Sequence, residues 1–422
     1  EGAVVVVLSW LVAIGAGAIP FLASGADVTR AVFESTSGWT TTGLSVVDVT
    51  SAPALLLFFR SLMQLAGGAG LAILMLSALT GPAGVSLTSA EGHGSLLVPH
   101  VRRSARLVMT LYSSYILFGI GALKGAGMGW FDAVNHAFCA LSTGGFSTRA
   151  ESIGAWNSAA VELVTILLMG LGMMNFLVGY ALWHGRWRVL WRNAEMRLLV
   201  FVVPLLVLCL YGGVTRSLDA GGSLRAALFQ TVTALSTTGY ASVDLHQWNG
   251  LGWLLLILLM LIGGGVGSTA GGLKQYRIYA LVQGVLWQLK GLFRAAGVVN
   301  QPVVWLGERR RFLTDRELRR VGIYVFFYLA VWLAGSAALA AFGHPPAASL
   351  FEFASTLGTV GLSVGVTSAA AHDGQLWVQI CGMLLGRLEF FVVFAGLFKV
   401  FGDLPALLRS RRQTTKATDF LR

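Results

Sequence analysis

Four short elements of threonine and glycine could coordinate a cation through backbone and hydroxyl oxygens. Each follows an apolar stretch and precedes another. They are Thr41-Thr42-Gly43, Thr143-Gly144-Gly145, Thr237-Thr238-Gly239 and Thr359-Val360-Gly361. Their last glycines are 102, 94 and 122 residues apart. A hard monovalent cation that sheds water needs such oxygens as replacement ligands, so the spacing predicts four loops around one cation-selective pore.

The residues before each element repeat as well. Nine positions before the last glycines stand Glu34, His136, Gln230 and Glu352, each preceded by Phe or Asn. The stretch between is about three helical turns long and too short to span a bilayer. Each quarter is therefore predicted to contain a helix, a half-helix, an extended loop and a second helix. A half-helix that ends at the axis favours a cation there, and glycine permits the loop's unusual backbone angles. The alternative, four glycine turns in ordinary membrane hairpins, does not explain the shared flanks.

The composition indicates a polytopic membrane protein. Of 422 residues, 55% are hydrophobic and 12% charged, with a mean hydropathy of +0.72, whereas soluble proteins carry about 25% charged residues. Eight spans are predicted in an all-α fold, near 4–23, 54–79, 105–123, 158–183, 196–214, 249–285 (interrupted), 318–342 and 375–401. They divide into four repeats with a pseudo-fourfold arrangement, at 1–80, 81–190, 191–300 and 301–422. The first segment has no basic residues before it and is expected to be a helix rather than a signal peptide.

The charges are distributed unequally between the two sides of these spans. The net charge is +11, and 22 of the 30 Lys and Arg residues follow the second helix of a pair, in Arg102–Arg106, Arg186–Arg197, Lys274–Arg320 and Arg409–Arg422. The positive-inside rule places these connections in the cytoplasm and the Thr-x-Gly loops toward the outside. The outer loops carry acids such as Asp48, Glu151, Asp219, Asp244 and Asp373, which would concentrate cations. This distribution argues against binding of nucleic acid.

Several longer sequence segments resemble the TrkH/KtrB family of potassium transporters. They are Phe131 to His136, Ser142 to Thr148, Gly263 to Lys274 and Met383 to Glu389. In addition, Thr359-Val360-Gly361 matches the start of the potassium-channel filter TVGYG. The resemblance covers nearly the whole chain. Members often have two further helices before the first repeat, and because residue 1 is Glu, we expect the natural N-terminus to be missing.

The resemblance implies potassium uptake across the bacterial inner membrane by a protein that is not an enzyme. It also implies a homodimer that works with a cytoplasmic ring of nucleotide-binding subunits. No nucleotide site or cofactor is recognisable in this chain, so regulation is expected to come from another protein. Arg294–Arg320 is a candidate docking surface, although positive-inside charge explains it equally well. In plant relatives, Ser in place of the first-repeat glycine accompanies sodium selectivity, so Gly43 favours potassium. Gly144, Thr42 and Thr238 depart from the channel filter, which has Val there.

A glycine-rich segment interrupts the sixth predicted span. It contains Gly263, Gly264, Gly265, Gly267, Ser268, Thr269, Gly271 and Gly272. It cannot be a phosphate-binding loop, because Leu273 stands where the lysine is required and no strand precedes it. A softened kink or close helix packing is one explanation. The family resemblance supports another, a loop under the filter that blocks ions until it moves.

Arg387 is the basic residue placed well inside a predicted span. An intramembrane charge is costly and usually faces a bundle interior or an aqueous cavity. Glu389 cannot share a helical face with it, since two positions correspond to about 200°. A buried ion pair with another group is one explanation. The family match favours a guanidinium below the filter that limits ion flow together with the glycine-rich segment.

Other polar residues suggest no further chemistry. Cys139, Cys209 and Cys381 lack a metal or disulfide spacing, and the histidines are scattered. Helix packing and hydrogen bonding suffice to explain Gln64 and Asn175 beside small residues. Three alternatives to the uptake protein stay open. They are a potassium-translocating subunit of a pumping ATPase, a cation symporter with inverted repeats, and a receptor or scaffold that transports nothing.

Overall fold

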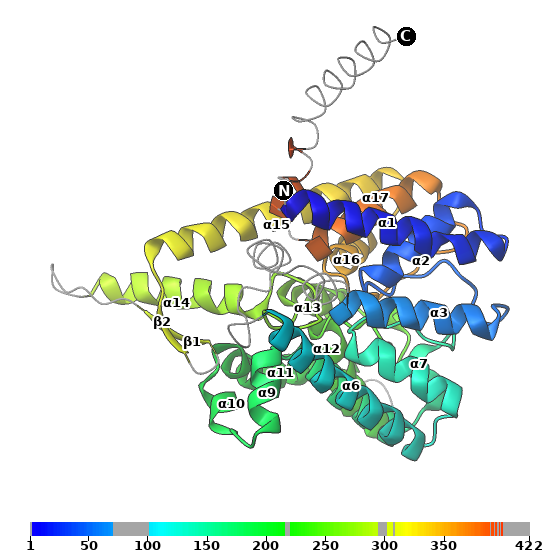
Figure 1. Cartoon of the computed structure of the whole chain (residues 1–422). Coiled ribbons are helices and arrows are strands. Elements are labelled where there is room, and N and C mark those ends of the chain that lie inside the picture. Colours follow the sequence, from blue (N-terminus) through cyan, green and yellow to red (C-terminus); the bar gives the residue numbers. More distant parts are fainter. Residues whose placement is uncertain are drawn as a thin grey trace, which may run out of the picture.

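The structure, a computed structural model, describes residues 2–70, 101–215, 220–293, 302–306, 309–388 and several positions from 390 to 399. Glu389, Asp219, the Arg409–Arg422 stretch and parts of the predicted second and eighth spans lie outside the described residues. The described part is mainly helical, and Figure 1 shows its helices gathered in one bundle.

Each repeat begins with a long apolar helix. These helices are α1 (Gly2–Ala23), α6 (Val101–Gly125), α11 (Ala194–Gly213) and α15 (Asp315–Ala341). Within the described residues, they are the four helices long and apolar enough to cross a membrane. Apolar side chains such as Val12, Phe201 and Phe326 point outward with 71–76% of their surface exposed. Such surfaces fit lipid, and the first span of each predicted pair is confirmed.

Each long helix is followed by a half-helix. These are α2 (Val28–Trp39), α7 (Trp130–Leu141), α12 (Ala220–Leu235) and α16 (Pro346–Leu357). Local sequence starts them, since the Asp27 side chain accepts the Arg30 N–H at the beginning of α2 and proline stands in the first turn of α16. They have 12 or 16 residues, so none crosses a bilayer alone.

The second helix of each repeat follows the half-helix and its loop. These helices are α3 (Ala54–Leu65), α8 (Ala159–Met173), α13 (Gly250–Ile262) and α17 (Asp373–Leu388). A π-helical turn, Ala66–Gly70, follows α3. The prediction of an unbroken span over 158–183 is wrong, because the helix stops at Met173 and α9 (Phe176–Trp183) starts after Met174 and Asn175. The predicted interruption in 249–285 is confirmed, with α14 (Gln275–Gly291) beyond it.

Contacts between repeats close the bundle into a cycle. The second helix of each repeat packs on the half-helix of the next: α3 on α7, α8 on α12, α13 on α16, and α17 on α2. In Figure 1, α2, α3 and α7 lie at the right of the molecule. Because all four junctions have the same sense, the ends of the half-helices are brought to one centre.

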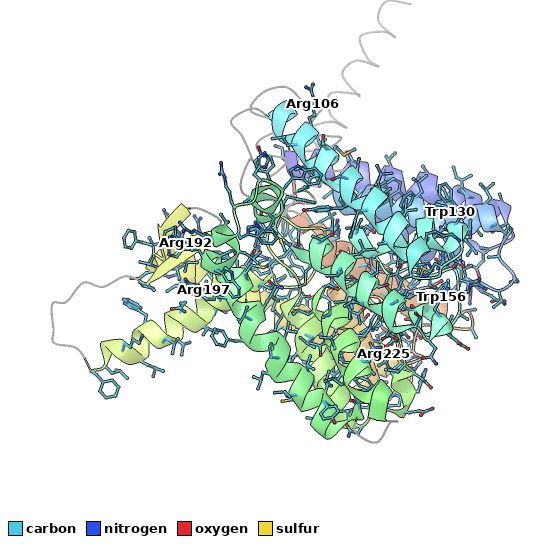
Figure 2. All side chains as sticks on the ribbon, turned by 90° about the horizontal axis from the view of Figure 1, so that it is seen from below. Arg106, Trp130, Trp156, Arg192, Arg197 and Arg225 are labelled. Atoms are coloured by element: carbon cyan, nitrogen blue, oxygen red, sulfur yellow. The ribbon has the colours of Figure 1, made fainter. Side chains whose placement is uncertain are left out.

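The two sides of the bundle differ in composition. Figure 2 shows Arg192 and Arg197 on one side and Trp130 and Trp156 on the opposite side. The basic side also carries α10 (Arg188–Arg192) and an antiparallel hairpin of β1 (Val303–Leu306) and β2 (Arg309–Phe312), in which Val303 pairs with Phe312. This hairpin, seen beside α14 at the left of Figure 1, was not predicted but does not alter the all-α membrane part.

Candidate cation site

The four Thr-x-Gly loops share one backbone conformation. Their first threonines, Thr41, Thr143, Thr237 and Thr359, have φ angles of 54°, 52°, 54° and 50°. Their last glycines also have positive φ, between 75° and 100°. A β-branched residue seldom adopts positive φ, so the surroundings must hold each threonine there. The sequence assigned unusual angles to the glycines alone.

The loops form a closed ring in which each glycine faces a carbonyl of the next repeat. A Cβ built on Gly43 would lie 2.1 Å from the Gly144 oxygen, and one on Gly145 would lie 1.8 Å from the Thr238 oxygen. A Cβ built on Gly239 would lie 1.9 Å from the Val360 oxygen, and one on Gly361 would lie 2.5 Å from the Thr42 oxygen. These four carbonyls, here called the ring carbonyls, leave no room for a side chain at any of the glycines.

The threonines that replace Val at the second position turn their hydroxyls away from the ring. The Thr42 hydroxyl is 2.7 Å from that of Thr40, and the Thr238 hydroxyl is 2.8 Å from that of Ser236. Both hydroxyls are therefore satisfied within their own loops. Threonine has nearly the shape of valine, so these two departures from the channel filter leave the ring carbonyls in place.

The polar residues nine positions before the glycines support the loops from behind. Glu34 Oε1 accepts hydrogen bonds from the Ser45 hydroxyl at 2.6 Å and the Val46 N–H at 2.6 Å. Glu352 accepts from the Ser363 hydroxyl at 2.7 Å in the fourth repeat. These contacts lie within one repeat, so the first and fourth half-helices hold their own loops, whereas among the described residues the buried Gln230 amide has no hydrogen-bond partner.

A vestibule of about 790 Å³ opens on the outer side of the ring. All four glycines line it, together with the predicted acids Asp48, Glu151 and Asp244. Hydrogen bonds from Thr50 hold the pKa of Asp48 below its usual value, so this carboxylate stays charged. Arg149 also lines the vestibule, but its guanidinium lies 3.0 Å from Asp132.

The glycine-rich segment lies against the inner ends of the loops. The Gly271 N–H donates to Thr237 Oγ1 at 2.7 Å, and Thr143 Oγ1 lies 3.2 Å from Thr269 Oγ1. A Cβ on Gly271 would meet Thr359 Oγ1 at 2.1 Å. The structure therefore brings together the filter and gate residues that the sequence predicted, with the segment touching three of the four loops.

The break between α8 and α9 receives the middle of this segment. Asn175 Nδ2 donates to the Val266 carbonyl at 2.5 Å, and the Phe176 N–H donates to the Gly267 carbonyl at 3.1 Å. The backbone groups that the break frees thus gain partners. The hydrogen bonding expected of Asn175 thus goes to the backbone of the glycine-rich segment. The sequence of 158–183 contains no proline, and its one charged residue, Glu162, lies in the first turn of α8, far from the break.

Glu195 is a second residue that the sequence analysis missed. It is fully buried at the start of α11, and its carboxylate accepts the Val266 N–H at 2.7 Å. Residue 195 and the segment are 71 positions apart, so only the fold reveals the contact.

Arg387 joins three parts of the chain at the inner side of the ring. Its Nη1 donates to the Thr269 carbonyl at 2.7 Å. Its Nη2 donates to the carbonyls of Gly67 and Gly68 at 2.7 and 3.0 Å. The guanidinium therefore connects α17, the glycine-rich segment and the π-helical turn after α3, rather than standing alone in a cavity.

The chemistry of the ring suits a monovalent cation better than a bound transition metal. Among the described residues, no group of three or more His, Cys, Asp or Glu could hold a metal ion. Within that same part of the chain, the buried hydroxyls of Thr41 and Thr359 have no hydrogen-bond partner. Unpaired buried oxygens are costly, and a partly dehydrated cation would satisfy them.

Known proteins with a similar sequence or fold are cation transporters. A family model described as "TrkH: Cation transport protein" matches residues 1–398. The chain is 33% identical over 410 residues to the Trk system potassium uptake protein TrkH of Salmonella typhimurium, covering 93% of this chain and 84% of the relative. It is 30% identical over 420 residues to TrkG of Escherichia coli K12, covering 94% and 85%. The crystal structure of the potassium transporter TrkH from Vibrio parahaemolyticus matches with a TM-score of 0.82 and 30% identity, covering 94% and 84%.

Proposed function

Because the chain belongs to the TrkH family of cation transport proteins, we propose that it takes up potassium across the bacterial inner membrane. The family consists of transporters, not enzymes. The observation that carries the proposal is the closed ring of loops, in which each glycine faces a carbonyl of the next repeat. The relatives named as potassium uptake proteins support the choice of ion.

Potassium enters from the vestibule and exchanges part of its water for oxygens of the filter loops. The acids Asp48, Glu151 and Asp244 attract cations to the mouth. The ring carbonyls and then the first-position threonine hydroxyls provide replacement ligands. The half-helices end at the ring, so their partial negative charge favours a cation there. Glycine at all four last positions favours potassium over sodium.

The glycine-rich segment and Arg387 close the path on the inner side. The segment occupies the inner ends of three loops, and the guanidinium adds a positive charge beside it. Opening requires loss of the contacts with Arg387, Glu195 and Asn175. These are separate hydrogen bonds to backbone groups, each worth about 0.5–1.5 kcal/mol or somewhat more where a charge is involved.

Regulation is assigned to partner proteins. The transporter acts as a homodimer with a cytoplasmic ring of nucleotide-binding subunits, as the family resemblance implies. The described part of the candidate docking stretch Arg294–Arg320 includes β2, whose sequence contains Arg309, Arg310 and Arg311 and which lies beside α14 in Figure 1. A basic hairpin on the cytoplasmic side suits an acidic protein surface.

Rubidium uptake into liposomes containing the purified protein tests this function. We expect uptake that resists an excess of sodium. Gly43→Ser places a Cβ 2.1 Å from the Gly144 oxygen and should lower both the uptake and that resistance. Folded protein that carries neither rubidium nor potassium, with or without Arg387→Ala to open the gate, would show that the proposal is wrong.

A further inference from the structure

Gln64 holds the second filter loop through two hydrogen bonds from another repeat. Its side chain, fully buried on α3, donates from Nε2 to the Gly144 carbonyl at 2.6 Å. Its Oε1 accepts the Phe146 N–H at 3.0 Å. The backbone N–H of Phe146 can only donate, so the amide oxygen must face it and the amide nitrogen must face Gly144. The hydrogen bonding expected of Gln64 thus goes to a filter loop of another repeat.

The same side chain fills the place of a missing one. The other three loops carry Thr42, Thr238 or Val360 at the position where the second loop has Gly144. A Cβ on Gly144 would lie 2.4 Å from Gln64 Cδ and 2.5 Å from its Oε1. Glycine at this position, the largest departure from the potassium-channel pattern, is thus explained by the glutamine behind it.

This contact makes one ring carbonyl different from the other three. Across the described residues, the carbonyls of Thr42, Thr238 and Val360 receive no hydrogen bond, whereas that of Gly144 does. A donor at 2.6 Å draws electron density from the oxygen and fixes its position. An oxygen with a weaker field compensates poorly for the water that a small, strongly hydrated ion such as sodium loses. It compensates better for the water that potassium loses, so the weaker field favours potassium.

We propose that Gln64 is a specificity-determining residue, which favours potassium over sodium by fixing and weakening the Gly144 carbonyl. This inference rests on the proposed function, since it concerns selectivity at the same ring. Gln64 is a positioning residue, because it acts on the ion through Gly144.

Replacing Gln64 with methionine tests the proposal, since methionine has a similar length but no amide. We expect Gln64→Met to keep rubidium uptake and to lower its preference over sodium by about five- to tenfold, the order expected for one hydrogen bond. Gln375→Met is the matched control. Gln375 is also buried and donates from Nε2 to a backbone carbonyl, that of Val366 at 2.7 Å, but it lies outside the ring. The control should change thermal stability without changing selectivity.

A reciprocal substitution keeps the test decisive if Gln64→Met fails to fold. Gly144→Ala should displace the glutamine, which lowers uptake through the steric clash and lowers the same preference. Adding Gln64→Ala should relieve the clash and restore uptake, but not the preference. Wild-type uptake with unchanged selectivity in Gln64→Met, or in Gly144→Ala, overturns this inference alone. Absence of uptake in the folded wild-type protein overturns the proposed function and this inference with it.

Discussion

The filter ring and the glycine-rich segment are both built from glycine backbone, yet they are held in different ways. The first and fourth ring loops are held by Glu34 and Glu352 of their own half-helices, and the second is held by Gln64 of the first repeat as well. Their glycines face backbone atoms of the neighbouring loop at distances that exclude any side chain. The segment is held by side chains of other elements, among them Asn175, Glu195 and Arg387.

The filter ring is therefore expected to stay in place, whereas the glycine-rich segment can move away from it. Moving one ring loop would disturb the next, because the four loops form a closed cycle. Moving the segment breaks only individual hydrogen bonds, which water in an inner cavity can replace. The account therefore expects ring substitutions to abolish or misdirect transport and segment substitutions to increase it.

The largest effect is expected for Gly239→Ala in the ring. Its Cβ would lie 1.9 Å from the Val360 carbonyl, and φ is 79°. We expect at least about a thirtyfold loss of rubidium uptake, since clash and backbone strain together exceed about 2 kcal/mol. Gly170→Ala in α8 is the control, because no atom lies within 4 Å of its Cβ and alanine favours helix. Equal uptake by the two variants would contradict the closed ring.

Arg387→Ala should have the next largest effect, in the opposite direction. It removes three hydrogen bonds and a positive charge from the inner side of the ring. We expect uptake without the regulatory partner to rise at least about tenfold, given about 1.5–3 kcal/mol for one charged hydrogen bond. Arg387→Lys keeps the charge with fewer donors and should lie between. Unchanged or abolished uptake by folded Arg387→Ala would count against a gating role.

Glu195→Ala should increase uptake less. The substitution removes the acceptor of the Val266 N–H, which weakens the closed segment by about 1 kcal/mol. Uptake should rise about threefold to fivefold, while selectivity stays unchanged because the ring is not touched. Glu195→Gln retains an acceptor and serves as the control. A loss of potassium preference in the alanine variant would show that the segment and the ring are not independent.

The smallest effect is expected for the ion pairs of Arg30, which join the outer ends of the first and fourth repeats. Arg30 pairs with Asp27 and with Asp373, at 3.3 Å for the latter. The N–H of Arg30 lowers the pKa of Asp27 below its usual value. The charged Asp27 carboxylate therefore stabilises the folded state above about pH 4, and this contribution is lost as the pH falls through the pKa of Asp27 in the folded protein.

Thermal unfolding of Asp27→Asn measures this contribution. Because Asp27 is half exposed, solvent screening limits the difference from wild type at pH 7 to less than about 1 kcal/mol. The difference should shrink below pH 4, and uptake should not change. A difference that grows as the pH falls would contradict the assignment.

Four matched flanks sufficed to place the half-helices and the loops. The glycine-rich segment and Arg387, which occur once, were predicted from their own residues and the family resemblance, but the side chains that contact the loops and the segment were missed. The contacts of Gln64, Asn175 and Glu195 join residues 71 to 91 positions apart. Each occurs in one repeat only, so no internal pattern could reveal it. The repeat boundaries at 80, 190 and 300 stay predictions.

The fold also bears on the symporter alternative. Inverted repeats would give two halves of opposite orientation. Here each second helix packs on the next half-helix in one sense around the cycle, from α3 on α7 to α17 on α2. A single orientation agrees with the charge pattern and favours four parallel units around one axis.

The location of the ion within the protein tests the central claim most directly. A crystal structure with rubidium in place of potassium would locate the ion by its anomalous scattering. The account predicts a peak on the axis between the carbonyls of Thr42, Gly144, Thr238 and Val360, and none within the glycine-rich segment. A fully ordered ring without a peak, or a peak confined to another part of the protein, would contradict it.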